Sequence, residues 1–235
     1  ALRPRASIAR RDFIKASTVA ALVGTAGSIK PSKTEAADVK PSIIPSENAR
    51  EGARDWQLTR VKLDKNGGYR APAIEGYCSH QSILAGRSLD FMVSTNPATK
   101  FTIEIFRTGY YGGRGARLMT TLGPFNGKKQ PDPGIGPKRL RECKWEPSTS
   151  LKIPADWPSG VYLGRLTTLP GADKPYWQNY VVFIVRDTRR ADILFQCSDN
   201  TWQAYNKWPD DYSLYTDPRG SHAREVAVSF RSEEH

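Results

Sequence analysis

Apolar and polar residues alternate along much of the chain between residues 59 and 187. The alternation is clearest over 88–94 and 101–105, and apolar residues dominate 161–166 and 180–185. A period of two residues is typical of a β-strand that buries one face. Glycine, proline and asparagine lie between these segments, where strands would turn. We therefore predict an Ig-like antiparallel β-sandwich over residues 59–187.

Residues 188–235 have a different pattern. The apolar run 191–197 predicts a buried strand, and Thr201 is a suitable N-cap for a short helix after it. Residues 213–216 suit a short extended piece, and 225–230 suit another strand. A strand followed by a helix is the first βα unit of an α/β domain, and one such unit cannot bury its own apolar surface. The predicted fold class is therefore β followed by α/β, and we expect the α/β domain to be incomplete in a chain that is a fragment.

Residues 1–37 resemble a twin-arginine export signal. The pair Arg10-Arg11 is followed by Phe13 and Lys15 at the offsets of that signal, and then by the mildly apolar stretch 16–27. These twelve residues are too few to cross the roughly 30 Å of a bilayer core as a stable helix. We therefore expect export by the twin-arginine machinery to the periplasm or the medium. An uncleaved signal that anchors the protein in the membrane is the alternative.

The chain has 235 residues and a formal net charge of +11. Residues 1–37 hold seven basic and two acidic side chains, so nearly half of the excess positive charge lies in the signal segment. The rest is spread over short clusters, which is typical of a solvated surface rather than of a nucleic-acid-binding face. We therefore predict no nucleic-acid partner. Residues 38–58 are polar, contain two prolines and are predicted to be a linker.

The three cysteines, Cys78, Cys143 and Cys197, have no spacing that is typical of a metal site. An oxidising compartment would permit one disulfide, between Cys78 and Cys143. Cys197 belongs to the predicted strand, where we expect a buried thiol. The sequence also lacks the G-x-S-x-G, H-E-x-x-H and phosphate-loop motifs and contains three histidines, so no catalytic residue is assigned.

Polar and aromatic residues follow the predicted strand. Asn200, Trp202 and Asn206 are candidate substrate-binding residues, because side chains past the carboxyl end of a strand line the ligand site of an open α/β sheet. Tyr205 is the candidate metal ligand, because a phenolate oxygen suits a hard cation such as ferric iron. The alternative is that Trp202 and Tyr205, three residues apart on one helix face, pack at a domain interface.

Two aromatic motifs of the predicted sandwich favour structural roles. The glycine-rich segment 109–115 lacks the spacing of a dinucleotide-binding loop and is predicted to connect two strands. Tyr162 opens a late strand, and a tyrosine in that place is commonly a structural corner.

Several motifs in combination resemble the large-subunit (beta subunit) family of N,N-dimethylformamidase, from about residue 70 to about residue 230. They are Gly76-Tyr77, Ser94-Thr95 and the segments 105–117, 157–162, 200–206 and 213–215. The resemblance implies a β-sandwich before an α/β domain, and hydrolysis of a formamide C–N bond at a mononuclear iron held by two tyrosines and one glutamate. It makes Tyr205 one iron ligand. The second ligand is Tyr162, Tyr215 or a residue beyond the end of this chain. The glutamate is expected downstream of this chain.

The resulting hypothesis is an exported, iron-dependent amidohydrolase of small amides, of which the chain as given is an inactive fragment. Whether the protein is an enzyme is left open. The alternative is a secreted, non-catalytic protein whose β-sandwich binds a carbohydrate or another protein. Assembly as a homo-oligomer or with a small subunit is also left open.

Overall fold

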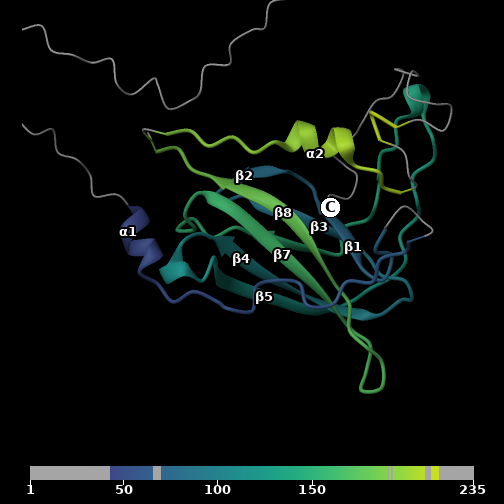
Figure 1. Ribbon diagram of the computed structural model, residues 1–235, viewed down its shortest axis with the longest axis horizontal. Coiled ribbons are helices and arrows are strands. Elements are labelled where there is room, and N and C mark those ends of the chain that lie inside the picture. The colour runs from purple at the N-terminus through teal and green to yellow at the C-terminus, as the bar shows by residue number, and fades with distance from the viewer. Residues whose placement is uncertain (1–42, 66–69, 190, 192, 210–212, 217–235) are drawn as a thin grey trace, which may run out of the picture. The chain divides into compact units, whose positions relative to one another are not determined.

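The computed structural model describes residues 43–65, 70–189, 191, 193–209 and 213–216 (Figure 1). The predicted signal at 1–37 and the predicted strand at 225–230 lie outside the described residues. No helix in the described part of the chain is long and apolar enough to cross a membrane.

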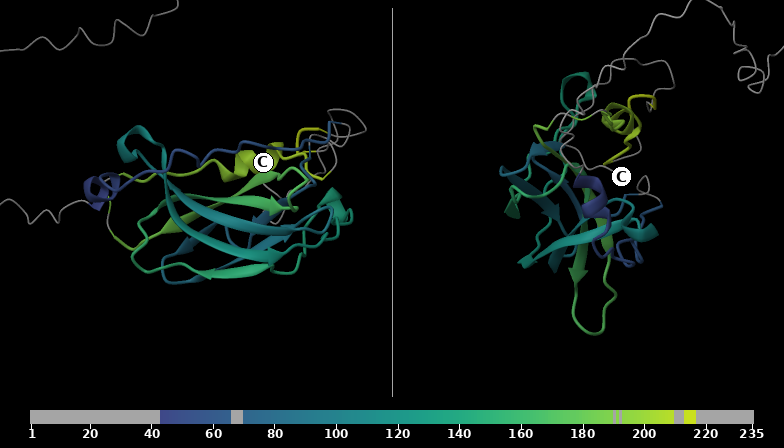
Figure 2. Two further views of the ribbon diagram at one scale, coloured as in Figure 1. Left: turned by 90° about the horizontal axis from the view of Figure 1, so that it is seen from below. Right: turned by 90° about the vertical axis from the view of Figure 1, so that its left-hand side faces the viewer.

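The strands of the described residues form two sheets (Figures 1 and 2). The three-stranded sheet has the order β1 (Glu75–Cys78), β3 (Ser88–Ser94) and β6 (Thr149–Lys152). The five-stranded sheet has the order β2 (Ser82–Leu84), β8 (Gln178–Arg186), β7 (Gly160–Leu169), β4 (Lys100–Thr108) and β5 (Ala116–Asn126). Neighbouring strands are antiparallel except β2 and β8, which are parallel. This architecture is compatible with the predicted β-sandwich.

The helical elements are short: α1 (Ile43–Asn48), α2 (Asp199–Tyr205) and the 3-10 turns η2 (Tyr111–Gly113) and η3 (Pro137–Arg139). The hairpin that joins β7 to β8 projects away from the sheets (Figures 1 and 2).

One hydrophobic core lies between the two sheets. It takes alternate residues of the long strands, as the period of two predicts: Leu89, Phe91 and Val93 of β3, Phe101, Ile103 and Ile105 of β4, and Val181, Phe183 and Val185 of β8. Aromatic rings fill its centre, where Phe183 meets Phe91 edge-on with centroids 5.9 Å apart. Removal of this apolar surface from water is the main driving force that holds the two sheets together.

The outer face of the three-stranded sheet is also buried. Tyr77 of β1 and Met92 of β3 are register partners on that face. Cys143 and Trp145, from the connection between β5 and β6, cover them together with Trp208. Trp208 follows α2 in the chain, so the C-terminal residues contribute directly to the packing of this sheet.

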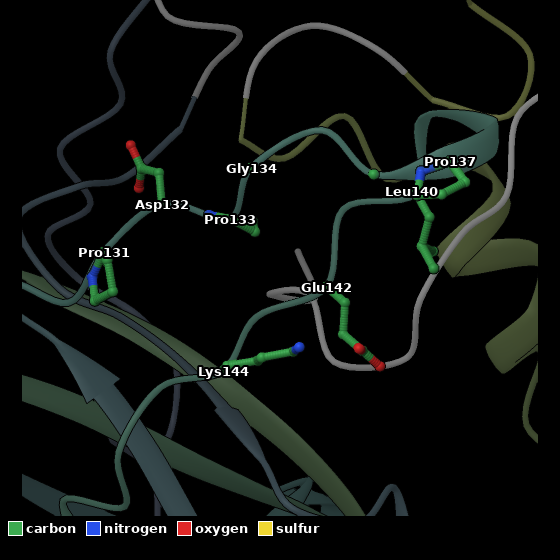
Figure 3. Close-up of a pocket in the computed structure, with 9 residues that line it drawn as sticks. Pro131, Asp132, Pro133, Gly134, Pro137, Leu140, Glu142 and Lys144 are labelled. Atoms are coloured by element: carbon green, nitrogen blue, oxygen red, sulfur yellow. The ribbon is translucent and has the colours of Figure 1, made fainter.

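The connection between β5 and β6 encloses a hollow of about 410 Å³ (Figure 3). Pro133, Pro137 and Leu140 line it with apolar surface, and Glu142 and Lys144 add one charge of each sign. Proline fixes the backbone dihedral φ, which lowers the conformational entropy that the chain loses when this long loop becomes ordered.

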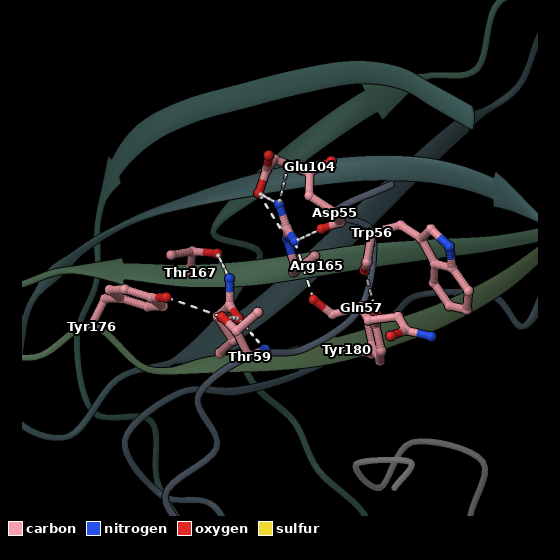
Figure 4. A network of polar contacts seen from close by, with 10 residues as sticks. Asp55, Trp56, Gln57, Thr59, Glu104, Arg165, Thr167, Tyr176 and Tyr180 are labelled. Atoms are coloured by element: carbon pink, nitrogen blue, oxygen red, sulfur yellow. Dashed lines mark hydrogen bonds and ion pairs between the residues drawn. The ribbon is translucent and has the colours of Figure 1, made fainter. Parts of the chain in front are cut away.

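The outer face of the five-stranded sheet is crossed by residues 55–60. Arg165 of β7 donates to the Glu104 carboxylate at 2.7 and 2.9 Å, and to the backbone oxygens of Asp55 and Gln57 (Figure 4). A buried guanidinium group is tolerated when its donors are satisfied in this way. Part of the segment predicted to be a linker therefore lies directly against the sheet.

A buried carboxylate also holds α1 on the sandwich. Glu47 accepts hydrogen bonds from the Tyr111 hydroxyl at 2.7 Å and from Arg117 at 2.9 Å, and Arg107 donates to the same hydroxyl at 2.8 Å. Burial opposes the ionisation of Glu47, but these hydrogen bonds and the arginine charges outweigh it and hold the pKa of Glu47 below its usual range. Tyr111 lies in the glycine-rich segment 109–115, which connects β4 to β5 as predicted.

The prediction of a buried strand at 191–197 is wrong. Residues 193–197 form no strand, and the side chains of Ile193, Leu194 and Phe195 are 84%, 91% and 79% exposed. A strand needs a neighbour that pairs with its backbone N–H and C=O groups. The described residues provide no such neighbour, so the apolar run lies on the surface and the α/β continuation stays a prediction.

Two further expectations for the C-terminal residues are wrong. Helix α2 begins at Asp199 with Ser198 in the N-cap position, so Thr201 lies inside the helix and does not cap it. Residues 213–216 form a tight turn closed by a bridge between Ser213 and Thr216, in place of the extended piece.

The expected disulfide between Cys78 and Cys143 does not form. Cys78 belongs to the core between the sheets, whereas Cys143 lies among the residues that cover the outer face of the three-stranded sheet. The sheet itself separates the two thiols. Cys197 is half-buried in an irregular segment, so the expected buried strand thiol is also wrong.

Candidate functional site

The structure brings together two of the three tyrosines that were predicted as metal ligands. Tyr205 is the last residue of α2, and Tyr215 lies in the tight turn at 213–216. Their ring centroids are 4.7 Å apart and the ring planes are tilted by 40°. Both side chains are accessible, with exposed fractions of 63% and 58%. We call Tyr205 and Tyr215 the tyrosine pair.

Backbone hydrogen bonds set the position of the turn against the helix. The Leu214 amide donates to the carbonyl oxygen of Ala204 at 3.0 Å, and Ala204 is buried. Within the turn, the Ser213 amide donates to Thr216 Oγ1 at 2.8 Å. These hydrogen bonds of backbone amides fix the turn against the helix. The position of the two tyrosine rings therefore does not depend on their mutual contact alone.

The candidate substrate-binding residues have different surroundings. Asn200 is exposed and lines a shallow polar hollow of about 370 Å³ with residues 196–201, and Trp202 is 43% exposed. Asn206 Oδ1 instead accepts a hydrogen bond from the Trp208 amide at 2.9 Å, which stabilises the turn of the backbone after α2. Asn200 and Trp202 are thus open to a ligand, while Asn206 shapes the backbone.

Trp208 anchors these residues on the sandwich. Its indole Nε1 donates to Glu75 Oε2 at 3.2 Å, and its ring meets Trp145 edge-on with centroids 5.9 Å apart. The Arg70 guanidinium group lies 5.1 Å from the centroid of the Trp208 ring. The Trp208 side chain is therefore held by a hydrogen bond at its N–H, by a cation–π contact on its ring and by an aromatic contact with Trp145.

An ion-pair network surrounds the indole. Arg70 donates to both carboxylate oxygens of Glu75, at 2.5 and 2.8 Å, and to Asp132 at 2.8 Å. Burial of Arg70 opposes its charge, but its two carboxylate partners outweigh this and raise the pKa of Arg70 above its ordinary value. The hydrogen bond from Arg70 lowers the pKa of Asp132. Glu75, with 1% of its surface exposed, is thus buried as one half of a bidentate pair.

Tyr162 lies elsewhere and is bonded in a different way. It is fully buried in the core, stacked on Trp157 at 5.1 Å and on Phe183 at 5.4 Å, and its hydroxyl donates to the carbonyl oxygen of Pro158 at 2.6 Å. Burial raises the pKa of Tyr162, which disfavours the phenolate that a metal would need. The structural corner predicted for Tyr162 accounts for these contacts. Of the two further candidates, Tyr215 is the one that lies beside Tyr205.

The sequence interpretation missed Arg70, Glu75 and Trp208. Glu75 did carry a signal, because it stands in the otherwise apolar run Ala73-Ile74-Glu75-Gly76-Tyr77. A charged residue in such a strand is commonly buried with a partner. Nothing in the sequence assigns that partner or links it to a tryptophan far along the chain.

The donor atoms of the site suit a hard cation in part. Two phenol oxygens belong to the accessible tyrosine pair, and phenolate oxygen binds ferric iron. Within the described ranges, no group of three or more His, Cys, Asp or Glu side chains is placed to hold a metal ion. In chemical type, the tyrosine pair matches two of the three ligands of an iron held by two tyrosines and a glutamate.

The sequence matches a known protein family. The family model described as N,N-dimethylformamidase beta subunit-like, C-terminal, matches residues 102–234. The matched range begins inside β4 and includes α2, Trp208 and the tyrosine pair. No curated protein matches the sequence.

Proposed function

The chain belongs to the N,N-dimethylformamidase beta subunit-like family, and from this premise we propose that it is part of an exported, iron-dependent hydrolase that cleaves the C–N bond of a small amide. The observation that carries the proposal is the tyrosine pair. Two accessible tyrosine rings from separate segments lie with their centroids 4.7 Å apart. Both belong to the range that the family model matches. Tyrosines that only pack would be expected to bury their rings, and these two do not.

We assign Tyr205 and Tyr215 as two of the iron ligands and expect the third, a glutamate, from outside the described residues. Bound iron would supply Lewis acidity at the amide carbonyl and an activated water molecule. The protein's own contribution is to hold the two tyrosine rings beside each other, with centroids 4.7 Å apart. The exposed side chains of Asn200 and Trp202 lie on the same helix, where they are able to orient an amide and to shield it from bulk water.

The substrate class follows from the family and from the open site. For N,N-dimethylformamide, hydrolysis adds one water across the C–N bond and releases formate and dimethylamine. An uncharged amide of this size needs no charged recognition group, which agrees with the polar but uncharged Asn200 and the aromatic Trp202 on α2.

Iron content and visible absorption of the purified protein test the metal site. A ferric ion bound by tyrosine gives a phenolate-to-iron charge-transfer band, so we expect a coloured protein. Tyr205→Phe and Tyr215→Phe should each remove the band and most of the iron. Tyr110→Phe is the matched control, because Tyr110 is also exposed, by 69%, but lies between β4 and β5.

Two results would decide against this function. A purified protein that holds no iron and takes up none from a ferric salt would favour the alternative of a non-catalytic binding protein. An undiminished band with undiminished iron content in both Phe variants would remove the tyrosine pair as ligands while leaving another iron site open. Release of dimethylamine from N,N-dimethylformamide, measured with the same variants, then reports on the hydrolysis itself.

Export is tested separately. Replacement of the arginine pair by lysine (R10K with R11K) keeps the charge of the segment but removes the twin-arginine feature. We expect the doubly substituted precursor to stay in the cytoplasm, as measured by cell fractionation. An unchanged periplasmic fraction would contradict export by this route.

A further inference from the structure

The outer face of the three-stranded sheet carries a clamp for a segment far along the chain. Tyr77 and Met92 form its apolar base, and Trp208 lies on them with 6% of its surface exposed. In a two-layer sandwich, this face would ordinarily be free to meet water. Its burial by a residue that follows α2 means that both faces of the sheet pack against other residues. The inner face closes the core, and the outer face holds Trp208.

The grip on Trp208 is polar as well as apolar. Glu75 accepts the indole N–H at 3.2 Å and is held by two hydrogen bonds from Arg70. The same guanidinium group lies over the indole ring at 5.1 Å. An apolar contact is not directional, whereas a hydrogen bond to a fixed carboxylate also sets the orientation of the ring. We call Arg70, Glu75 and Trp208 the indole clamp.

The clamp is linked to the tyrosine pair through a short piece of backbone. Trp208 lies three residues after Tyr205, and its amide is bonded to Asn206 at 2.9 Å. On the other side of Tyr205, Gln203 and Ala204 are buried, and Ala204 accepts the hydrogen bond from Leu214 that places Tyr215. Tyr205 is therefore held between two buried points, and a shift at Trp208 moves one of them.

We propose that Glu75 and Trp208 are positioning residues for Tyr205 and Tyr215, a role that rests on the proposed function as far as iron is concerned. Neither residue is assigned as an iron ligand. They act through the backbone, by fixing the end of α2 on the sandwich so that the two rings meet. The sandwich thereby supports the site.

The proximity of the two rings is measurable without iron. Photo-oxidation with a ruthenium trisbipyridine complex and persulfate couples neighbouring tyrosines, and mass spectrometry of the digested protein identifies a Tyr205–Tyr215 product. Trp208→Phe keeps an aromatic ring but removes the N–H donor, and Glu75→Gln keeps the size but removes the charge that pairs with Arg70. Trp56→Phe is the matched control, because it removes an indole hydrogen bond of 2.8 Å, to the backbone of Arg114, at a distant place.

We expect several-fold less of the Tyr205–Tyr215 product in Trp208→Phe and an intermediate yield in Glu75→Gln, with Trp56→Phe equal to the parent protein. Titration with a ferric salt should show affinity about tenfold weaker in Trp208→Phe, the usual scale for loss of a supporting residue. Circular dichroism identifies a variant that fails to fold, and if Trp208→Phe does so, Glu75→Gln decides.

Unchanged product yield in both folded variants would overturn the positioning role, whatever the iron result. If the product falls as expected but the parent protein binds no ferric ion, the positioning role stands and the proposed iron site fails.

Discussion

The tyrosines of the sandwich and those of the C-terminal residues differ in what surrounds the ring. Tyr111 and Tyr162 are 2% and 0% exposed, and each hydroxyl donates a hydrogen bond to an identified partner, Glu47 or Pro158. Tyr205 and Tyr215 are more than half exposed and contact each other. The same residue type thus has a buried, hydrogen-bonded hydroxyl group in one region and an accessible ring in the other.

The same contrast holds for apolar residues. Within the sandwich, alternate side chains of β3, β4 and β8 are removed from water. Among the C-terminal residues, the side chains of Ile193, Leu194 and Phe195 are exposed to water, although these are three consecutive large apolar residues. Apolar composition therefore stabilises a region only where a neighbour covers it, and Trp208 is the place where the C-terminal residues obtain such a neighbour.

The largest expected effect compares two phenylalanines. Phe183→Ala should lower the free energy of unfolding by about 4 kcal/mol, because the ring fills the centre of the core and little can move into its place. Phe195→Ala should change it by about 0.5 kcal/mol or less, because the side chain is 79% exposed. Chemical denaturation of the two variants measures both values. Equal losses would mean that the apolar run is covered in solution.

A pair of glutamates gives the next effect. Glu47→Ala leaves Arg107 and Arg117 without their buried carboxylate and should cost about 3 kcal/mol, limited because α1 is able to detach and admit water. Glu51→Ala is the matched control. Its ion pair with Arg114 is 3.4 Å long, its side chain is 87% exposed, and such pairs contribute about 0.5 kcal/mol. Equal decreases of the denaturation midpoint in both variants would contradict a stabilising role for the buried hydrogen bonds of Glu47.

Removal of single hydroxyl groups sharpens the comparison of tyrosines. Tyr162→Phe should cost about 1 kcal/mol, because the carbonyl oxygen of Pro158 loses its buried donor. Tyr205→Phe should leave the free energy of unfolding of the metal-free protein within about 0.5 kcal/mol, because its ring is exposed. If Tyr205→Phe destabilised the metal-free protein as much as Tyr162→Phe, the hydroxyl of Tyr205 would have a structural role in place of a ligand role.

The sandwich was predictable from the sequence because its signal is local. Alternation over 88–94 and 101–105 sets which residues face inward, and the structure places β3 and β4 there. Tyr162 as a corner and 109–115 as a connection were also predictable, because turn chemistry is encoded within a few residues.

The site was predictable only in part because its geometry depends on contacts between distant segments. The motif around Tyr205 predicted a helix, and α2 lies there, but Tyr215 and Tyr162 could not be separated without knowing which one the chain folds back to Tyr205. The apolar run at 191–197 has the composition of a strand, yet strand formation depends on a partner that the sequence of the run cannot reveal. The link between Glu75 and Trp208 spans 133 positions, and no periodicity reports it.

The smallest expected effect is a dependence of stability on pH that distinguishes the two regions. Glu47 has a lowered pKa in the folded protein, so its ionised form favours folding. Its contribution is complete above the ordinary value of 4.5 and is lost as the pH falls from there through the lower pKa of the folded state. The loss should be a fraction of that in Glu47→Ala, because the protonated carboxyl still fills its place and still accepts a hydrogen bond.

Asp132 has a lowered pKa as well and adds a loss of the same sign at the indole clamp. Free energies of unfolding between about pH 6 and about pH 2.5 should therefore fall less steeply in Glu47→Gln and in Asp132→Asn than in the parent protein. Because Glu47 ties down α1 and Asp132 pairs with the arginine that holds Trp208, only Asp132→Asn should also change how the yield of the Tyr205–Tyr215 product varies with pH. An identical change in Glu47→Gln would show that the two regions are coupled and that the contrast between them is one of accessibility alone.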